Sequence, residues 1–412
     1  MARPGDVPGV SSRGSLAARL RDRLPAGALE APAGPTARLR PAPVACALPA
    51  DPQAVGVLLA AARAERAPVV VVGEGSRLGS GAGLPAGGYL ALSSARLSGV
   101  LESEPGSLWL RAGAGTPLRE LAARAAELGL RPVGVEPDDP GSLGGFLART
   151  ARVADPITGL DQPAALSVEG LLADGTPIAS LAAPRSACGP EYASLLLGHG
   201  GAFGVITAAR VKLEPLPERR LVLGLTFVDP AAALELFRAL PLHDFPPRRA
   251  ELELAPGREA RLLVCLEGDA ELAGRALADV RRAGEAQGGQ GEELEQARGW
   301  LGGAGAPDGL EAWVSHGAVA RGLASGLAAP FGLAGPALVR LDRPGLNGCR
   351  LRLAAPRAGG PDRLRRALDP EGREARAAAD ERELLGRLRA RLDPDGLLNP
   401  QALPGPGAGG GP

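Results

Sequence analysis

Four consecutive valines, Val69–Val72, lead directly into a glycine-rich segment that extends to Gly83. A β-branched run between Pro68 and Gly73 predicts a short strand that is covered on both faces. Glycine permits positive φ and the close approach of a ligand, so the turn that follows can present main-chain N–H groups to an anion such as phosphate. A turn that only connects two strands explains the same residues equally well.

The glycines after the valines do not form a Rossmann fingerprint. That fingerprint, G-x-G-x-x-G, follows a strand and opens a helix. Gly73 and Gly75 fit its first two positions, but Leu78 stands at the third. The Gly87-Gly88 pair and a second apolar run follow where a helix is required. A strand, a glycine-rich loop and another strand are therefore expected.

Composition narrows the class of protein. A length of 412 residues allows two or three domains, and a formal net charge of +0 gives no sign of a nucleic-acid or anionic-membrane partner. The four cysteines (Cys46, Cys188, Cys265 and Cys349) are too far apart for a zinc site and predict buried free thiols in a reducing compartment. The N-terminus lacks an apolar signal region and no window is long enough for a transmembrane helix, so we expect a cytoplasmic protein.

Local patterns predict several elements. Asp51 precedes a helical period that stops at Pro68, and Thr116 is expected to cap an amphipathic helix that runs to Leu128. The alternating stretch "GVITAARVKL" from Gly204 predicts a strand. After Pro217 the pattern reads strand, helix, strand, strand, helix, which is typical of a ferredoxin-like layer.

Four motifs in one order carry a family resemblance. They are "GEGSRLGSG" from Gly73, "PDDPGSLGG" from Pro137, "GHGGAFGVIT" from Gly198 and "LDPDGLLNP" ending at Pro400. Together they resemble the FAD-linked oxidases of the vanillyl-alcohol oxidase / PCMH-type superfamily. Within it, the chain is most similar to the FAD-binding subunit of glycolate oxidase.

The resemblance implies an α+β fold, with a PCMH-type FAD-binding domain of two α/β subdomains and a ferredoxin-like α+β cap domain. It divides the chain into an N-terminal extension and helix, the FAD-binding domain, a cap or substrate domain, a C-terminal helix and turn that return to the FAD domain, and a disordered tail. The corresponding ranges are 1–38, 39–217, 218–378, 379–402 and 403–412.

The resemblance also implies that FAD is bound non-covalently, since the first loop holds no histidine or cysteine for a covalent bond. The first loop would face the pyrophosphate, the second segment would line the pyrophosphate and isoalloxazine from the other side, the third would meet the adenine half, and an asparagine after the last helix would reach back to the flavin. The expected cofactor-binding residues are Gly73, Glu74, Gly75, Ser76, Arg77, Leu78, Gly79, Pro140, Gly141, Ser142, Leu143, Gly144, Gly145, Gly201, Gly204, Val205, Ile206 and Asn399.

Catalytic groups are harder to identify. Oxidation of a 2-hydroxy acid by flavin needs a hydride acceptor, a base for the hydroxyl proton and cations for the carboxylate. The family's catalytic subunits carry a histidine cluster resembling H-x-H-H, but His199, His243 and His316 are dispersed here, so no metal site is expected. His316, at the end of a predicted strand, is the best candidate for the base, although a surface turn also explains it. His199 is expected to face solvent.

Arg350 and Arg352 lie on one face of a predicted strand and are candidates for binding a substrate carboxylate. In a chain whose cations are almost all arginine, a solvated arginine face explains them too.

Three functional hypotheses follow. The first is an FAD-binding oxidoreductase subunit of a glycolate or other 2-hydroxy acid oxidase or dehydrogenase complex, with a larger flavin subunit and an iron–sulfur subunit. The second is a degenerate flavin-family scaffold or assembly subunit without its own catalysis, because Arg77 and Ala202 stand where the family has threonine or serine. The third is a reductase of the UDP-N-acetylenolpyruvoylglucosamine type, against which the cap-like middle region and "LDPDGLLNP" argue.

Overall fold

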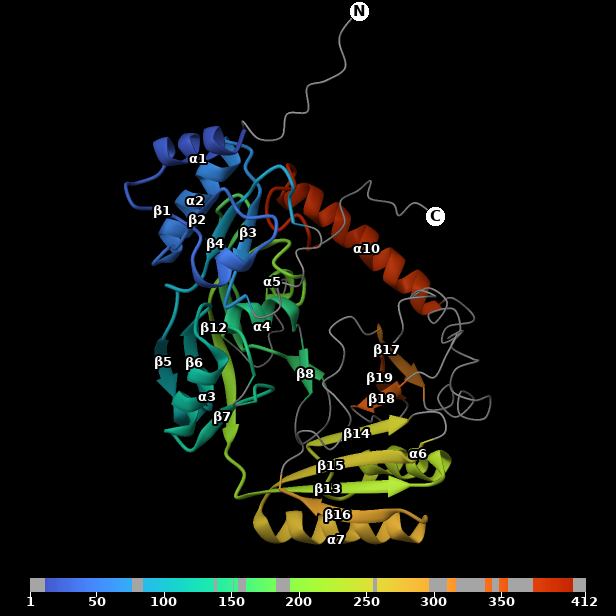
Figure 1. Ribbon diagram of the computed structural model, residues 1–412. Coiled ribbons are helices and arrows are strands. Elements are labelled where there is room, and N and C mark those ends of the chain that lie inside the picture. The colour runs from blue at the N-terminus through green and yellow to red at the C-terminus, as the bar shows by residue number, and fades with distance from the viewer. Residues whose placement is uncertain are drawn as a thin grey trace, which may run out of the picture. The chain divides into compact units, whose positions relative to one another are not determined.

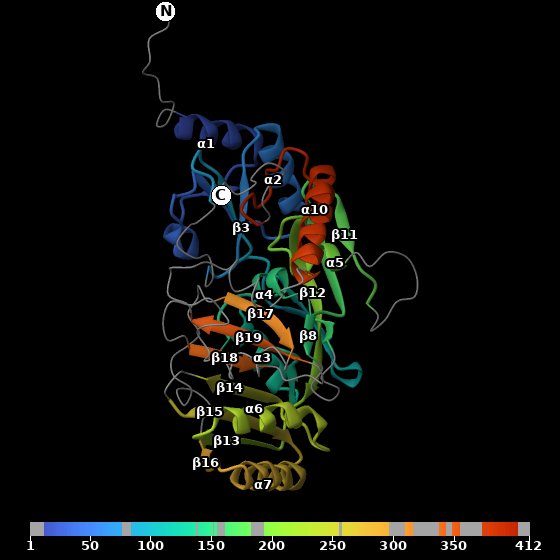
Figure 2. The same ribbon diagram turned by 90° about the vertical axis from the view of Figure 1, so that its right-hand side faces the viewer.

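The computed structural model (Figures 1 and 2) contains two compact units. Unit 1 comprises Met1–Asp155, Leu160–Leu216 and Glu381–Pro412, and unit 2 comprises Pro156–Gly159 and Pro217–Asp380. The C-terminal segment is therefore part of the same unit as the glycine-rich segments. The structure describes residues 12–75, 84–136, 139–150, 152–154, 161–182, 193–254, 258–295, 310–315, 338–342, 348–354 and 373–402.

A four-stranded sheet in the order β1-β2-β4-β3 forms the first part of unit 1. Strands β2 and β3 both run parallel to β4. The helix α2 connects β2 to β3. Asp51 accepts a hydrogen bond from the N–H of Ala54 at 2.8 Å, which explains why α2 begins where the sequence predicts. The four valines form β3, as expected, and three of them are buried. The elements are α1 (Ser12–Arg23), β1 (Leu29–Glu30), β2 (Ala45–Ala47), α2 (Pro52–Ala64), β3 (Val69–Val72) and β4 (Leu90–Ser93).

The second sheet of unit 1 is antiparallel and has the order β11-β10-β12-β6-β5, with β7 also paired to β12. Helices α3 and α4 supply Leu121, Leu143 and Leu147 to the core on one face, where they meet Leu110 of β6 and Val211 of β12. The alternating stretch from Gly204 is the long strand β12, as predicted. The elements are β5 (Val100–Glu104), β6 (Trp109–Gly113), α3 (Leu118–Ala126), β7 (Leu130–Pro132), α4 (Leu143–Arg149), β10 (Ser167–Leu172), β11 (Pro177–Ala179), α5 (Ala193–Leu196) and β12 (Gly204–Pro215), beside the separate pair β8 (Arg152–Ala154) and β9 (Asp161–Pro163).

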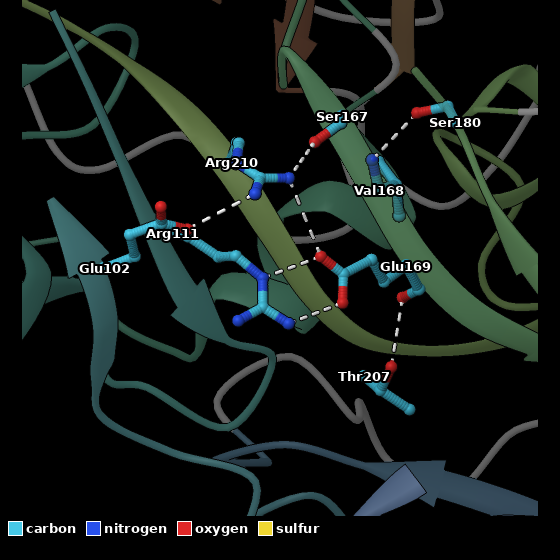
Figure 3. A network of polar contacts seen from close by, with 8 residues as sticks. All are labelled: Glu102, Arg111, Ser167, Val168, Glu169, Ser180, Thr207 and Arg210. Atoms are coloured by element: carbon cyan, nitrogen blue, oxygen red, sulfur yellow. Dashed lines mark hydrogen bonds and ion pairs between the residues drawn. The ribbon is translucent and has the colours of Figure 1, made fainter. Parts of the chain in front are cut away.

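The face of the second sheet opposite this core carries a network of ion pairs (Figure 3). Arg111 donates hydrogen bonds of 2.7 Å and 2.6 Å to the two carboxylate oxygens of Glu169. Arg210 contacts Glu169 at 3.9 Å and Glu102 at 3.3 Å, and its guanidinium lies 5.1 Å from the ring centroid of Trp109. Arg111 and Arg210 are direct cross-strand partners. The glutamates therefore compensate two like charges that would otherwise repel each other.

Replacing Glu169 by glutamine is expected to destabilise unit 1 in a pH-dependent way. The hydrogen bonds from Arg111 hold the pKa of the Glu169 carboxyl below its ordinary value, against the opposing effect of partial burial. The stabilisation is therefore fully present above the unfolded pKa of about 4.3 and is lost as the pH falls through the lower folded pKa. Urea unfolding should show a stability gap between wild type and E169Q at about pH 7 that closes at about pH 3. A gap of the same size at both pH values would contradict this origin.

Unit 2 contains a βαββαβ motif formed by β13, α6, β14, β15, α7 and β16. The four strands lie in the order β16-β13-β15-β14 with every neighbour antiparallel. This is the ferredoxin-like arrangement predicted from the sequence after Pro217. Strands β18, β19 and β17 extend the sheet to seven strands. The elements are β13 (Arg219–Phe227), α6 (Pro230–Ala239), β14 (Arg249–Leu254), β15 (Ala260–Gly268), α7 (Ala270–Ala286), β16 (Gln290–Leu294), β17 (Leu310–Ser315), β18 (Leu338–Asp342) and β19 (Gly348–Ala354). The last helix, α10 (Arg373–Leu392), contains the division between the two units, and its part from Glu381 belongs to unit 1.

The two helices of the βαββαβ motif cover the same face of its sheet. Phe237 of α6 and Val280 of α7 belong to one core cluster with Leu225 of β13, Leu252 of β14 and Leu262 of β15. Because side chains alternate along a strand, the neighbouring residues of these strands point to the other face. The cap-like unit therefore has its own core, as an independently packed layer requires.

Candidate functional site

The first and second glycine-rich segments, 67 residues apart in the chain, lie against each other at the end of β3. A Cβ placed on Gly73 would lie 2.2 Å from Oγ of Ser142, so a side chain at this position would displace the Ser142 hydroxyl. The carboxylate of Glu74 accepts a hydrogen bond of 3.2 Å from the main-chain N–H of Gly141. Gly75 and Gly141 have φ of +68° and +106°, which favours glycine at both positions. The two segments thus meet at one place.

The segment Gly113–Thr116 joins them, although none of the four sequence motifs includes it. A Cβ on Gly115 would lie 1.9 Å from the carbonyl oxygen of Ser94, and one on Gly113 would lie 2.2 Å from that of Leu97. These contacts are between main chains, so no side-chain rearrangement can relieve them. The glycines bring the end of β6 against the residues that follow β4.

Thr116 does not cap the helix as predicted. Helix α3 begins at Leu118, and its N-cap residue is Pro117. The proline ring has no atom that can accept a hydrogen bond. The Thr116 hydroxyl, which is fully buried, instead accepts a hydrogen bond of 2.9 Å from the N–H of Gly99. The tertiary contact therefore takes the place of the local capping interaction.

The second glycine segment becomes the first turn of α4. Ser142 is the N-cap residue and accepts a hydrogen bond of 3.4 Å from the N–H of Gly145. The N–H of Gly144 donates to the carbonyl of Ala114 at 2.7 Å, and a Cβ on Gly144 would lie 2.8 Å from that of Ala114. Leu143 is fully buried in the core of the second sheet. Leu143 therefore has a packing role, and its main-chain N–H donates a hydrogen bond of 2.9 Å to the carbonyl of Thr116.

Asn399 connects the third glycine segment to β3. Its Oδ1 accepts a hydrogen bond of 2.8 Å from the N–H of Val71, and its Nδ2 donates one of 3.0 Å to the carbonyl of Gly201. Its own N–H donates to the carbonyl of Val69 at 2.7 Å. A Cβ on Gly201 would lie 2.7 Å from this Nδ2, and Gly201 has φ of +76°. The side chain of Asn399 thus holds two segments that are far apart in sequence.

A buried ion pair holds the turn that carries Asn399, and no sequence pattern pointed to it. Arg389 and Asp393 lie 3.9 Å apart and are 5% and 7% exposed. Arg389 donates a hydrogen bond of 2.8 Å to the carbonyl of Leu398, and Asp393 accepts from the N–H groups of Leu397 and Leu398. Burial lowers the pKa of Arg389, against the opposing effect of Asp393. The hydrogen bonds that both side chains make to the main chain of this turn offset part of the free-energy cost of burying the two charges.

The remaining predicted residues of the third segment belong to β12. Gly204 lies opposite Leu172 in the ladder with β10, and a Cβ there would lie 2.5 Å from the carbonyl oxygen of Leu171. Val205 and Ile206 are buried in two different core clusters. These three residues therefore shape the sheet.

Several predicted residues cannot be placed. Ser76, Arg77, Leu78, Gly79 and the candidate base His316 lie outside the described residues. Pro140 directly precedes Gly141 at the junction.

The main chain of Arg350 and Arg352 is described in β19 of unit 2. Arg350 lies opposite Asp342 and Trp313, and Arg352 lies opposite Arg340 and Glu311. Arg350 and Arg352 therefore stand two residues apart on one strand, and their binding of a substrate carboxylate stays a prediction.

Two buried polar atoms beside the third segment have no hydrogen-bond partner among the described residues: Nδ1 of His199 and Oε1 of Gln401. The ring of His199 packs edge-on against Phe203 with centroids 5.3 Å apart, so the prediction that His199 faces solvent is wrong for Nδ1. A Cβ on Gly200 would lie 3.2 Å from that of Ala402, so the third glycine segment and the residues after Asn399 are close to each other here. A buried unpaired polar atom costs about 1–3 kcal/mol. These are atoms that a bound polar group can satisfy.

Comparison with known families and proteins identifies the cofactor. Residues 43–179 match the family described as an FAD binding domain. The chain is 29% identical over 189 residues to the uncharacterized FAD-linked oxidoreductase Rv2280 of Mycobacterium tuberculosis, covering 45% of this chain and 41% of that protein. It is 30% identical over 238 residues to the D-2-hydroxyglutarate dehydrogenase of Xanthomonas citri pv. viticola, covering 55% of this chain and 50% of that protein. The matched part thus spans half or less of the length of these relatives.

Solved structures support the fold. Alkyldihydroxyacetonephosphate synthase superposes with a TM-score of 0.68 at 16% identity, over 97% of this chain and 87% of that one. The 4-ethylphenol oxidase of Gulosibacter chungangensis superposes with a TM-score of 0.67 at 15% identity, over 99% of this chain and 100% of that one. The expected α+β class is confirmed, and the match to an FAD binding domain bears out FAD as the cofactor. The similarity to FAD-linked oxidoreductases agrees with the expected superfamily. A particular closeness to glycolate oxidase is not confirmed.

The residues of unit 1 fit FAD in two respects. The described parts of the glycine-rich segments meet at the ends of β3 and β6, and the unpaired atoms of His199 and Gln401 lie beside the third segment.

Among the residues that the structure describes, no group of three or more His, Cys, Asp or Glu side chains is placed to hold a metal ion. Within the same residues, no helix has the length and apolar character needed to cross a membrane.

Proposed function

We propose that this chain is an FAD-dependent oxidoreductase that oxidises a small 2-hydroxy acid. The observation that carries the proposal is the meeting of three glycine-rich segments and Asn399 within unit 1, inside and beside the region that matches an FAD binding domain. Main-chain N–H groups at such bends are suited to a diphosphate. Bound FAD would supply the hydride acceptor, and we take it to be held non-covalently.

In this proposal the chain's own residues hold and orient the cofactor. Gly73, Gly75 and Gly141 present main chain to the diphosphate, together with the Ser76–Gly79 part of the first loop. The third segment and Asn399 lie further along the cofactor. Leu143, Val205 and Ile206 contribute by fixing the strands and the helix that carry these bends.

The substrate class is proposed from the similarity to one relative and from two arginines of β19. The similarity to a D-2-hydroxyglutarate dehydrogenase favours a 2-hydroxy acid over other alcohols. Arg350 and Arg352 are proposed to bind the carboxylate, because a guanidinium matches a carboxylate in a two-point hydrogen bond. His316 is kept as the candidate base for the hydroxyl proton.

We also propose a setting for the protein. The missing histidine cluster favours a subunit that works with a larger flavin subunit and an iron–sulfur subunit, as in a glycolate oxidase complex. Cys46 and Cys265 are buried and form no disulfide bond among the described residues, which supports a reducing compartment and a cytoplasmic location. The competing scaffold hypothesis rests on Arg77 and Ala202, where the sequence departs from the family.

Anaerobic reduction of the bound flavin tests this function. The FAD-loaded full chain is mixed separately with D-2-hydroxyglutarate, glycolate and D-lactate, and the visible flavin band is followed. At least one of these acids should bleach the band, whereas the matching alcohols without a carboxylate should not. A protein that binds FAD but is reduced by none of them, even with a partner flavin subunit and an iron–sulfur subunit added, would favour the scaffold hypothesis.

A further inference from the structure

We propose that Arg119 is an anion-binding residue of the diphosphate site. Its guanidinium offsets the charge of Glu74 and donates a hydrogen bond to a phosphate oxygen of FAD. The inference rests on the proposed function, because it takes the diphosphate to lie where the first two glycine-rich segments meet.

The starting observation is a carboxylate at that junction. Glu74 follows Gly73 directly and accepts a hydrogen bond of 3.2 Å from the main-chain N–H of Gly141. This N–H belongs to the second glycine segment, so an acidic group occupies one of the donors expected to face phosphate. A carboxylate beside a doubly charged diphosphate is repulsive unless a cation compensates it.

Arg119 is the cation beside this carboxylate. Its Nη2 lies 3.1 Å from Oε1 of Glu74, and its Nη1 lies 3.4 Å from Oε2. Within residues 73–75, 113–119 and 140–148, the ionisable side chains are those of Glu74 and Arg119. Asp139 precedes Pro140, and its carboxylate accepts a hydrogen bond of 2.9 Å from the main-chain N–H of Glu136. Arg119 is therefore the cation that pairs with Glu74 at the junction.

The main chain holds Arg119 at the junction. Leu118, its neighbour, donates a hydrogen bond of 2.9 Å from its N–H to the carbonyl of Gly141, and Pro117 forms a bridge with Ser142. The side chain of Arg119 is 66% exposed, and that of Glu74 is 26% exposed. A guanidinium has five N–H donors in a planar fork, and the contacts to Glu74 use two of them. Donors therefore remain to bind a phosphate oxygen while the ion pair persists.

A set of four variants of the full chain tests this role: R119A, E74Q, the double variant R119A/E74Q, and R124A as control. Arg124 lies on the same helix and pairs with Glu127, away from the glycine-rich segments in sequence. Binding of FAD is measured by quenching of flavin fluorescence, and ADP and adenosine are measured by calorimetry. ADP carries a diphosphate and adenosine does not, so the pair of ligands isolates the phosphate contribution.

R119A should bind FAD and ADP about tenfold more weakly or worse, with adenosine unchanged. The double variant should bind FAD more tightly than R119A, because removing the carboxylate's charge removes the repulsion. R124A should bind like the wild type. If R119A fails to fold by circular dichroism, R119K replaces it and should keep most of the affinity, since it keeps the charge.

Two results would overturn the inference while leaving the proposed function intact: R119A that binds FAD as tightly as wild type, or a double variant no tighter than R119A. A wild-type chain that binds neither FAD nor ADP would instead overturn the proposed function, and this inference with it.

Discussion

Replacing Asn399 by alanine is expected to destabilise unit 1 strongly and to abolish FAD binding. The substitution leaves the N–H of Val71 and the carbonyl of Gly201 without the partners that now lie at 2.8 Å and 3.0 Å. Each stranded group costs about 1–3 kcal/mol when it is buried, so we expect a loss of roughly 2–5 kcal/mol in the free energy of unfolding. Alanine also tolerates the positive φ of 40° at this position less well than asparagine does.

Two further variants separate these causes. Glycine accepts the positive φ, so N399G removes the side chain without the backbone strain. N399D keeps an acceptor for Val71 but turns the donor to Gly201 into an anion that faces a carbonyl. In urea unfolding, N399G should lie between wild type and N399A, and N399D should also be destabilised. If N399A unfolds at the wild-type urea concentration, the connection between β3 and the third segment is not needed for stability.

The second large effect is expected from Gly115→Val. Its Cβ would lie 1.9 Å from the carbonyl oxygen of Ser94 and 2.7 Å from the carbonyl carbon, and both are main-chain atoms. The end of β6 and the residues after β4 must then separate, which also displaces Ala114 from the N–H of Gly144. We expect a loss of several kcal/mol, about 3 or more, and with it loss of the bend geometry.

Gly87 supplies the matched control. It lies in the same unit, has no heavy atom within 4 Å of a Cβ placed on it, and does not have positive φ. G87V should unfold at nearly the wild-type temperature and bind FAD normally. Thermal melts of G115V and G87V should therefore differ widely. Equal melting temperatures and equal FAD affinities would show that the close approach at Gly115 has no role in forming the site.

Elements with strong local signals were predictable. The four valines between Pro68 and Gly73 predict a buried strand from their β-branched side chains alone. Asp51 caps its helix with its own side chain, which accepts a hydrogen bond from a residue three positions later. The ferredoxin-like layer follows from the alternation of strands and helices after Pro217. In each case the interactions that determine the element lie within a few residues of each other.

Features that depend on distant partners were not predictable. The hydroxyl of Thr116 looked like a helix cap, but it bonds Gly99, because a contact across the fold competes with the local one. Asp393 lies within the motif "LDPDGLLNP", but its ion pair with Arg389 gave no signal, since one more arginine in an arginine-rich chain carries little information. Gly115 appears in sequence as one glycine among many, and only its distance to Ser94 shows why a side chain is excluded.

The candidate site shows the same division. The glycine motifs predicted where the bends lie, and the resemblance predicted the cofactor that the family match supports. The contacts of Glu74 with Gly141 and Arg119, by contrast, join three segments whose spacing in sequence gives no hint of their meeting. Charge compensation between segments is a property of the folded chain.

The central claim is that the glycine-rich bends of unit 1 hold one FAD, and a direct titration of the purified full chain with FAD tests it. The account predicts a yellow protein that binds one FAD per chain, with ADP competing for the site and FAD raising the melting temperature through linkage. A chain that is folded by circular dichroism, yet stays colourless, shows no quenching of flavin fluorescence and melts at the same temperature with and without excess FAD, would contradict it.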